Sequence, residues 1–271
     1  MLGINTNVPS LTAQKNLTSS SSSINTSISR LSSGLRINSA RDDAAGLAIA
    51  TRMSSEVRGS EVAKRNTNDG ISALQIADGA LSTVTDNVQR MRELAVQAAT
   101  GTLTTDDRTN LLAEFDALGA QLTDIATDTK FNGVSLLTGT PANLAIQTGA
   151  NSGDTTTVNL VNGSTIATAV DGADISTAAA ATTALTTIDA QLTALNTGRA
   201  TIGAGINRLD AVVSNLDTTV TNVSAARGRI MDADFAKETA NLTRTQILQQ
   251  AGTAMLAQAN QLPNNVLSLL R

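Results

Sequence analysis

The sequence predicts a mainly α-helical protein, an elongated antiparallel coiled-coil or helical-bundle rod with a small β-hairpin region. Apolar residues recur at alternating steps of three and four over long stretches, the spacing of one helix face. The longest run, 185–230, would extend about 70 Å as one helix. A compact globule of 271 residues would have a radius of gyration of only about 18–19 Å. Both ends of the chain carry the same pattern with few charges, so we expect the N- and C-terminal helices to pair.

The N-terminal helix is expected to begin near Ile4 and to reach Leu35. Lys15 is its only charge before Arg30. The expected apolar face consists of Ile4, Val8, Leu11, Leu17, Ile24, Ile28, Leu31 and Leu35. Gly34 then favours a break, and a charged joint follows over 36–43.

Helical spacing resumes at Ala45 and is clearest along one stripe: Leu74, Ala77, Leu81, Val84, Val88, Met91, Ala95 and Ala98. Gly101 is expected to end this helix, and Thr104 or Thr105 to cap the next one. That next helix carries Phe115, Leu118, Leu122 and Ile125 on one face. The dipeptides Asn132-Gly133 and Asn162-Gly163, with alternation over 155–161, predict small hairpins between about 129 and 176.

The last segment, 245–271, is predicted to be a helix that packs on the N-terminal one. Its apolar face consists of Leu248, Ala251, Met255, Ala259, Leu262, Val266 and Leu269, and no charge occurs before Arg271. Uncharged polar sides suit burial among other helices, where an unpaired charge would be costly. Gln and Asn side chains interrupt any apolar run long enough to cross a membrane. Pro263 predicts a kink or an end of the helix.

The composition excludes several classes of function. The chain has no Cys, His, Trp or Tyr, which removes the usual metal ligands, thiol nucleophiles and Ser–His arrangements. We therefore expect no enzyme, no cofactor and no metal. A net charge of −4 and a pI near 4.8 argue against nucleic-acid binding. No cationic segment followed by an apolar one opens the chain, so no ordinary secretory signal is expected.

Four long motifs closely resemble bacterial flagellin, the subunit of the flagellar filament. They are SRLSSGLRINSARDDAAGLAIA (29–50), QRMRELAVQAA (89–99), FNGVSLL (131–137) and ILQQAGTAMLAQANQLPNNVLSLLR (247–271). The region between about 138 and 184 is too short for a large outer domain, so the chain resembles a minimal flagellin. In such a subunit, 1–40 and 231–271 would form the terminal coiled-coil domain of the filament's inner core. Residues 41–230 would form the outer-core helical domain.

The resemblance implies a structural protein for swimming motility. Such chains pass unfolded through the flagellar type III secretion channel and polymerise outside the cell. Implied partners are other copies, the cap and hook-associated proteins, the export apparatus and a flagellin chaperone, with no nucleic acid and no membrane insertion. The residues expected to drive self-assembly are Leu11, Leu17, Ile24, Ile28, Leu31, Leu248, Met255, Leu262, Val266 and Leu269.

A receptor or subunit contact is expected at Arg90, Leu94 and Glu114, where flagellins recognised by Toll-like receptor 5 carry the same residue types. Leu94 is the one large apolar residue in a polar stripe beside the core stripe, and the alternative is that it packs within its own fold. A hook–filament junction protein is the alternative structural function. A zinc protease insert, found in some flagellins, is excluded because the chain has no His.

Several other features have competing interpretations. Asp42-Asp43 is either a catalytic carboxylate pair or, more simply, part of a solvated or ion-paired joint with Arg36 or Arg41, because adjacent residues on a helix do not face each other. Arg199 and Arg227 are either inter-subunit ion-pair partners or snorkelling side chains. The Gly203–Gly205 stretch (203–205) favours close helix packing over a phosphate loop, since no strand precedes it.

Overall fold

The computed structural model describes residues 6–139 and 143–268, with side chains up to Gln261 at the C-terminal end. Within these ranges the helices are α1 (Val8–Ser33), α2 (Ala44–Ala98), α3 (Thr105–Asp128), α4 (Gly163–Asp171), α5 (Ala178–Met231) and α6 (Phe235–Ser268). The strands are β1 (Lys130–Phe131), β2 (Val134–Ser135), β3 (Asn143–Gln147) and β4 (Thr155–Asn159). The predicted mainly helical class with a small β region is confirmed.

The chain divides into two compact units. The terminal unit comprises Met1–Ser55 and Asn222–Arg271, and the central unit comprises Glu56–Thr221. The terminal unit joins the two ends of the sequence, whereas the central unit is one continuous segment in which α2 and α5 pair.

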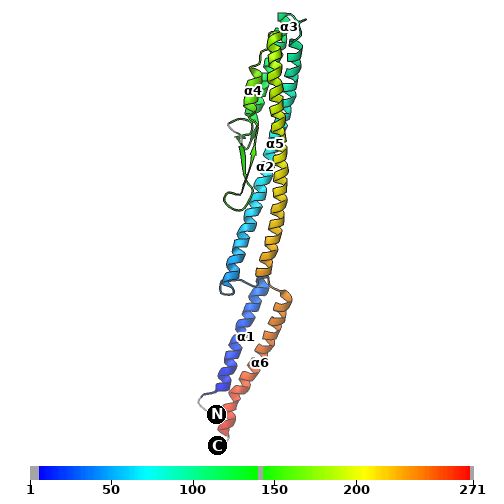
Figure 1. The fold of residues 1–271 in the computed structure, drawn as a ribbon. Coiled ribbons are helices and arrows are strands. Elements are labelled where there is room, and N and C mark those ends of the chain that lie inside the picture. Colours follow the sequence, from blue (N-terminus) through cyan, green and yellow to red (C-terminus); the bar gives the residue numbers. More distant parts are fainter. Residues whose placement is uncertain (1–5, 140–142, 269–271) are drawn as a thin grey trace. The chain divides into compact units, whose positions relative to one another are not determined.

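In the terminal unit, α1 and α6 lie side by side and antiparallel (Figure 1). The Asn7 side chain caps α1 by accepting a hydrogen bond from the Ser10 N–H. Gly34 ends α1 in the left-handed conformation at φ 72°, which a glycine adopts without strain. The expected end of the N-terminal helix is therefore correct to within two residues.

The joint after α1 is more ordered than a simple turn. Leu35 forms an antiparallel bridge with Asp232. The Arg36 N–H donates to the Met231 carbonyl at 2.6 Å, and the Ala233 N–H donates to the Gly34 carbonyl at 2.9 Å. The connection between α1 and α2 and the connection between α5 and α6 are thus held together by backbone hydrogen bonds.

Asp42 and Asp43 act as caps in this joint. Asp42 accepts hydrogen bonds from the Ser39 hydroxyl and from the N–H groups of Asn38 and Ser39, which lower the pKa of its carboxyl. Asp43 accepts from the Gly46 N–H at 2.8 Å, at the start of α2. The carboxylates satisfy backbone donors at a turn and a helix terminus. The pair thus belongs to the joint, but its observed partners are backbone and hydroxyl groups, and the Arg36 guanidinium donates to the Ile230 carbonyl instead.

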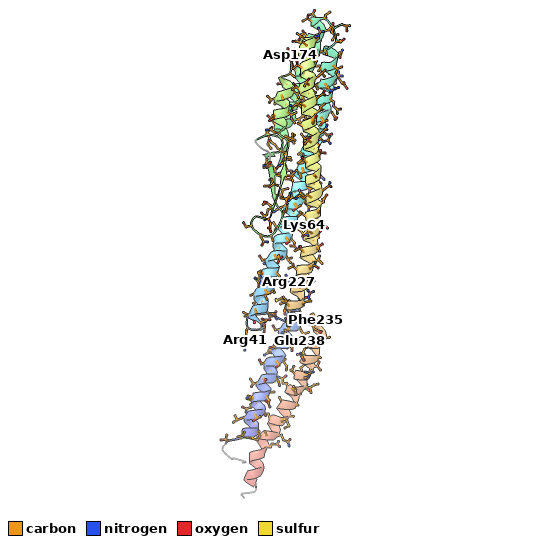
Figure 2. All side chains as sticks on the ribbon, viewed as in Figure 1. Arg41, Lys64, Asp174, Arg227, Phe235 and Glu238 are labelled. Atoms are coloured by element: carbon orange, nitrogen blue, oxygen red, sulfur yellow. The ribbon has the colours of Figure 1, made fainter. Side chains whose placement is uncertain are left out.

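The central unit has a continuous apolar core from α2, α3 and α5. All members of the predicted α2 stripe are buried, together with Phe115, Leu122, Ile188, Leu195, Ile202 and Leu209. Three ion pairs join α2 to α5 in antiparallel order: Lys64–Asp217, Asp78–Arg199 and Arg92–Asp189 (Lys64 is labelled in Figure 2). Arg199 therefore has its partner within the chain, at 2.9 Å. Arg227, in the terminal unit, reaches the Ser54 hydroxyl at 3.4 Å.

Thr104 caps α3 as predicted, in a reciprocal capping box with Asp107. The Asp107 pKa is lowered by the Thr104 hydroxyl and N–H that donate to its carboxylate. Arg108 supports the preceding loop, because its guanidinium donates to the carbonyls of Ala98, Thr100 and Leu103. The end of α2 and the start of α3 are thus fixed by side-chain contacts.

The β region contains two antiparallel hairpins rather than a larger sheet. Asn132 and Gly133 both have positive φ between β1 and β2, as an Asn-Gly hairpin turn requires. β3 pairs with β4, and Val158 and Ile146 pack against Gly205 of α5 and Gly70 of α2. The glycines at 203–205 thus lie within a helix, as expected, and the close approach at Gly205 is made by a strand.

The predicted turn at Asn162-Gly163 is wrong. Asn162 is the N-cap of α4, and its side chain accepts a hydrogen bond from the Thr165 N–H. Asn is favoured both in hairpin turns and at helix N-caps. The buried residues Ile166, Ala167 and Val170 have helical spacing and decide between the two.

At the C-terminal end, α6 continues through Pro263 to Ser268, so the helix does not end at the proline. Within the described part of the chain, no helix is both long and apolar enough to cross a membrane.

Candidate assembly interface

The residues predicted to drive self-assembly do not all lie between α1 and α6. Leu11 and Ile28 on α1 are exposed, and Leu17, Ile24 and Leu31 are half-buried. On α6, Leu248 is 52% exposed and Met255 is 65% exposed. The side chains of Leu262 and Val266, and the whole of Leu269 and Ile4, lie outside the described residues. The prediction that the α6 apolar stripe packs on α1 is therefore wrong for Leu248 and Met255.

A different face of α6 contacts α1. We call this contact the seam. Its positions on α1 are Ser10, Ala13, Leu17, Ser20, Ile24, Ser27 and Leu31, and those on α6 are Glu238, Leu242, Thr245, Gln249, Gly252, Leu256 and Ala259, all buried or half-buried. Both sets alternate steps of three and four, so the pair has the spacing of a two-stranded coiled coil. The predicted pairing of the terminal helices is confirmed, but a different face of α6 packs against α1.

Small and polar residues occupy much of the seam. Leu17 comes within ordinary van der Waals reach of a Cβ placed on Gly252, so this glycine marks a close approach of the helices. Polar groups bond across the seam: the Ser10 hydroxyl contacts the Asn260 side-chain oxygen at 2.8 Å, and the Asn7 side chain donates to the Ala259 carbonyl at 2.8 Å. The pair is thus held partly by hydrogen bonds, each of which adds only about 0.5–1.5 kcal/mol of net stability.

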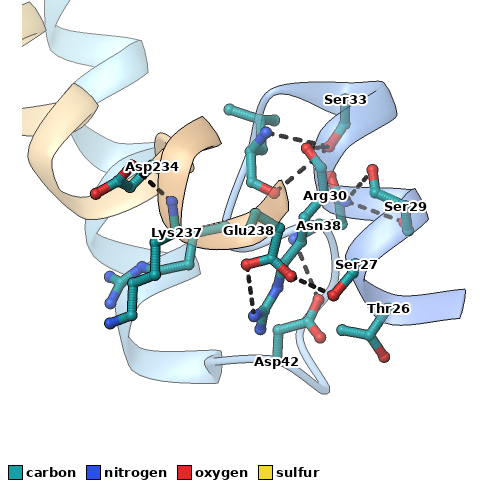
Figure 3. Close-up of polar contacts among 12 residues, drawn as sticks. Thr26, Ser27, Ser29, Arg30, Ser33, Asn38, Asp42, Asp234, Lys237 and Glu238 are labelled. Carbon is teal, nitrogen blue, oxygen red and sulfur yellow. Dashed lines mark hydrogen bonds and ion pairs between the residues drawn. The ribbon is translucent and has the colours of Figure 1, made fainter. Parts of the chain in front are cut away.

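Glu238 forms a buried polar cluster with Ser27 and Arg30. Its side chain lies between Ser27 and Arg30 (Figure 3). The Ser27 hydroxyl donates to the carboxylate at 2.6 Å, and the Arg30 guanidinium is 3.8 Å from the other carboxylate oxygen. Glu238 is only 8% exposed. Sequence reasoning missed it because only apolar positions were counted on α6. The seven-residue repeat that links Glu238, Thr245, Gly252 and Ala259 could have revealed it.

An open apolar groove lies beside the seam. It has a volume of about 740 Å³ and is lined by Val8, Pro9, Thr12, Ala13, Asn16, Leu17, Ser19, Ser20, Leu248, Ala251, Gly252 and Met255. The α6 residues of the predicted apolar stripe therefore form a wall of this groove. Val8, Leu248 and Met255 are each more than half exposed at this groove, which makes it the candidate interaction site of the terminal helices.

The charge of the two terminal helices suits burial. Among the 23 acidic residues of the chain, α1 and α6 hold Glu238 alone. Their basic residues are Lys15, Arg30, Lys237 and Arg244. Charged groups are depleted from the cores of protein interfaces because their desolvation is costly. A surface with so few charges can be covered by another protein at little electrostatic cost.

The second predicted contact, at Arg90, Leu94 and Glu114, is only partly on the surface. The Arg90 guanidinium pairs with Glu114 of α3 at 2.9 Å and with Glu93 at 2.9 Å, and all three side chains are about half exposed or more. These hydrogen bonds to Glu93 and Glu114 raise the pKa of the Arg90 guanidinium above its ordinary value. Leu94 is 1% exposed and belongs to the same core as Phe115. The expectation of an exposed Leu94 is wrong, because the buried arc of α2 is wider than the stripe read from the sequence.

These features define a structural protein whose terminal helices offer an uncovered apolar surface, with no group of His, Cys, Asp or Glu placed to hold a metal among the described residues. Comparisons with known proteins agree with this class. The bacterial flagellin N-terminal helical region matches residues 4–142, and the bacterial flagellin C-terminal helical region matches residues 185–270.

Individual relatives give the same result. A flagellin of Halalkalibacterium halodurans is 46% identical over 270 residues, covering 99% of both chains. A flagellin of Bacillus subtilis is 42% identical over 303 residues, again covering 99% of both. The crystal structure of Bacillus cereus flagellin superposes with a TM-score of 0.51 at 35% identity, covering 60% of this chain and 94% of that one.

The chain belongs to the bacterial flagellin family. It is a structural subunit of the extracellular flagellar filament, and the alternative of a hook–filament junction protein is not favoured. Self-polymerisation follows from family membership.

Proposed function

We propose that copies of this chain polymerise through the α1–α6 pair, and that the apolar groove beside the seam is covered by terminal helices of neighbouring copies. The observation that carries the proposal is the exposure of Leu11, Ile28, Leu248 and Met255 on helices with few charges. Burying one such side chain fully is worth about 1.5–3 kcal/mol. Because these side chains are not buried within the chain, that stabilisation is available for assembly.

The proposal includes the division of labour expected from the sequence. Residues 1–40 and 231–271 serve as the inner core of the filament, and residues 41–230 serve as the outer core. The central unit has its own apolar core and so does not need neighbours to bury it. The terminal pair has a seam in which small and polar residues alternate with aliphatic ones, and it depends on neighbours to bury its remaining apolar side chains.

Export and capping complete the proposed function. The chain passes unfolded through the flagellar export apparatus with the help of a flagellin chaperone, and adds at the tip beneath the cap protein, above the hook-associated proteins. Support comes from family membership and from the terminal pair, whose weak seam is easily kept unfolded before assembly.

A deletion tests the proposed assembly core. Removal of residues 245–271 takes away the whole α6 wall of the groove and much of the seam. The shortened chain should keep the helical circular dichroism and melting transition of the central unit, and it should form no filaments in seeded polymerisation. Filaments of normal diameter from the shortened chain would show that the terminal pair is not the assembly core.

A second candidate function is recognition of the monomer by Toll-like receptor 5. The exposed Arg90–Glu114 pair favours it, since these two side chains from α2 and α3 present a guanidinium and a carboxylate together. Leu94 would act by supporting α2 from within the core rather than by touching the receptor.

A further inference from the structure

The seam repeats itself along α1. Leu17, Ile24 and Leu31 occupy one set of equivalent positions seven residues apart, and Ser20 and Ser27 occupy another. A shift of α6 by seven residues toward the start of α1 would exchange Leu31 for Ile24, Ile24 for Leu17 and Ser27 for Ser20. The seam positions change in kind only near the start of α1, where Ser10 and Ala13 lie. Apolar packing distinguishes poorly between two such registers.

The backbone bridge between Leu35 and Asp232 restrains the pair at the joint, and within the seam Glu238 distinguishes the two registers. In the observed register its carboxylate accepts a hydrogen bond from the Ser27 hydroxyl at 2.6 Å and lies 3.8 Å from the Arg30 guanidinium. After a seven-residue shift toward the start of α1, Glu238 would meet Ser20, and the residue three positions further on would be Ser23 instead of Arg30. The opposite shift would bring it to Gly34, beyond the end of α1.

We infer that the Glu238–Ser27–Arg30 cluster fixes the register of the α1–α6 pair and so aligns the groove for assembly. This inference rests on the proposed function. The groove needs Val8 and Leu17 from α1 opposite Leu248 and Met255 from α6. A seven-residue shift moves one helix by about 10 Å along the other and would separate these walls. Glu238 is thus a positioning residue for assembly.

General experience with buried polar groups supports this role. A buried charged cluster usually adds little stability compared with apolar residues of similar size, yet a single polar position can specify the register of a coiled coil. The cluster lies at seam positions that would otherwise hold apolar residues. Its replacement by apolar residues should then relax register without weakening the pair.

Cysteine pairs can report the register, because the chain contains no cysteine. Ser21→Cys with Gln249→Cys joins two positions whose side chains meet in the observed register, where Gln249 Nε2 lies 3.4 Å from Ser21 Oγ. Ser21→Cys with Leu242→Cys reports the shift that places Glu238 at Ser20. Each pair is introduced into the parent, into Glu238→Gln, and into the double variant Ser27→Ala/Glu238→Leu. Lys237→Gln is the matched control on the adjacent exposed residue. All are mixed as a minority with parent subunits under polymerising conditions, and the soluble and filament fractions are oxidised separately.

The parent, the Lys237→Gln control and Glu238→Gln should form the 21–249 cross-link with little of the 21–242 cross-link, because the glutamine oxygen still accepts from Ser27. Over both fractions, the double variant should raise the ratio of 21–242 to 21–249 cross-link about tenfold or more, as expected when about 1.4 kcal/mol of register preference is lost, and the 21–242 species should stay in the soluble fraction. The same low ratio in the double variant, or a 21–242 species that enters filaments as readily as the 21–249 species, would overturn the inference. Failure of the parent itself to form filaments would instead overturn the proposed function.

Discussion

The central unit and the terminal pair are both antiparallel helical assemblies, but they bury different residues. In the central unit, large apolar side chains such as Phe115, Leu195 and Met91 are fully buried in one core. In the terminal pair, Ser10, Ser27, Glu238 and Ala259 are buried while Leu248 and Met255 are exposed. The same helical periodicity thus yields one part that completes its core alone and one that leaves large apolar side chains exposed.

Truncation of a core residue should have the largest effect, and only on the central unit. Phe115→Ala should destabilise that unit by about 3–5 kcal/mol, because it leaves a cavity in a close-packed core. Leu248→Ala, at an exposed position, should change the stability of the monomer by only about 0.5 kcal/mol or less. Thermal unfolding of both monomers followed by circular dichroism measures the difference. Equal destabilisation by the two substitutions would contradict the contrast between the units.

In polymerisation, unlike in monomer stability, substitution of the exposed groove residues should have a large effect. Leu248→Ala together with Met255→Ala should raise the critical concentration for filament growth about tenfold or more, because apolar burial at the groove is lost. Thr253→Ala is a suitable control, as it is exposed on the same helix and does not line the groove. The concentration of protein that remains soluble after seeded growth measures the critical concentration. An unchanged critical concentration would remove the groove from the proposed interface.

The receptor proposal predicts a smaller and local effect. Arg90→Ala and Glu114→Ala should each lower activation of Toll-like receptor 5 by monomer several-fold, with unchanged circular dichroism. Arg92→Ala is the matched control, since Arg92 is also about half exposed on α2 but pairs with Asp189 of α5. Equal loss for the control would indicate a general effect of charge, and no activation by the unmodified monomer would reject receptor recognition.

The smallest expected effect is the pH dependence of the ion pair between Arg92 and Asp189. The hydrogen bond from Arg92 lowers the pKa of the Asp189 carboxyl below 3.8. Its contribution to stability is therefore present above the unfolded-state value and is lost as the pH falls through the folded-state value. Asp189→Asn should destabilise the central unit slightly at pH 7, and this difference should shrink as the pH falls below the ordinary range of an aspartate pKa. A difference that stays constant into the acid range would mean that packing, rather than charge, explains the substitution.

Much of the fold follows from the sequence because the apolar stripes of α2, α3 and α5 are long and regular. The capping box at Thr104 and the turn at Asn132-Gly133 were equally readable, since each rests on local chemistry. Leu94 was misplaced because the number of helices that cover α2 is a tertiary property. α6 was misread for the opposite reason: its apolar stripe is real, but it faces away from α1, and the polar residues at Glu238 and Gln249 occupy the seam.

Hydrogen exchange on monomer and filament tests the central claim most directly. Ordering each residue costs about 1–2 kcal/mol of backbone entropy, and a seam of small and polar residues offsets little of it without neighbours. Backbone amides of α1 and α6 over 8–33 and 235–261 should exchange rapidly in the monomer and slowly in the filament, while amides of the central unit over 74–98 and 188–216 exchange slowly in both. Slow exchange of α1 and α6 in the monomer would contradict the claim that neighbouring copies complete the terminal pair.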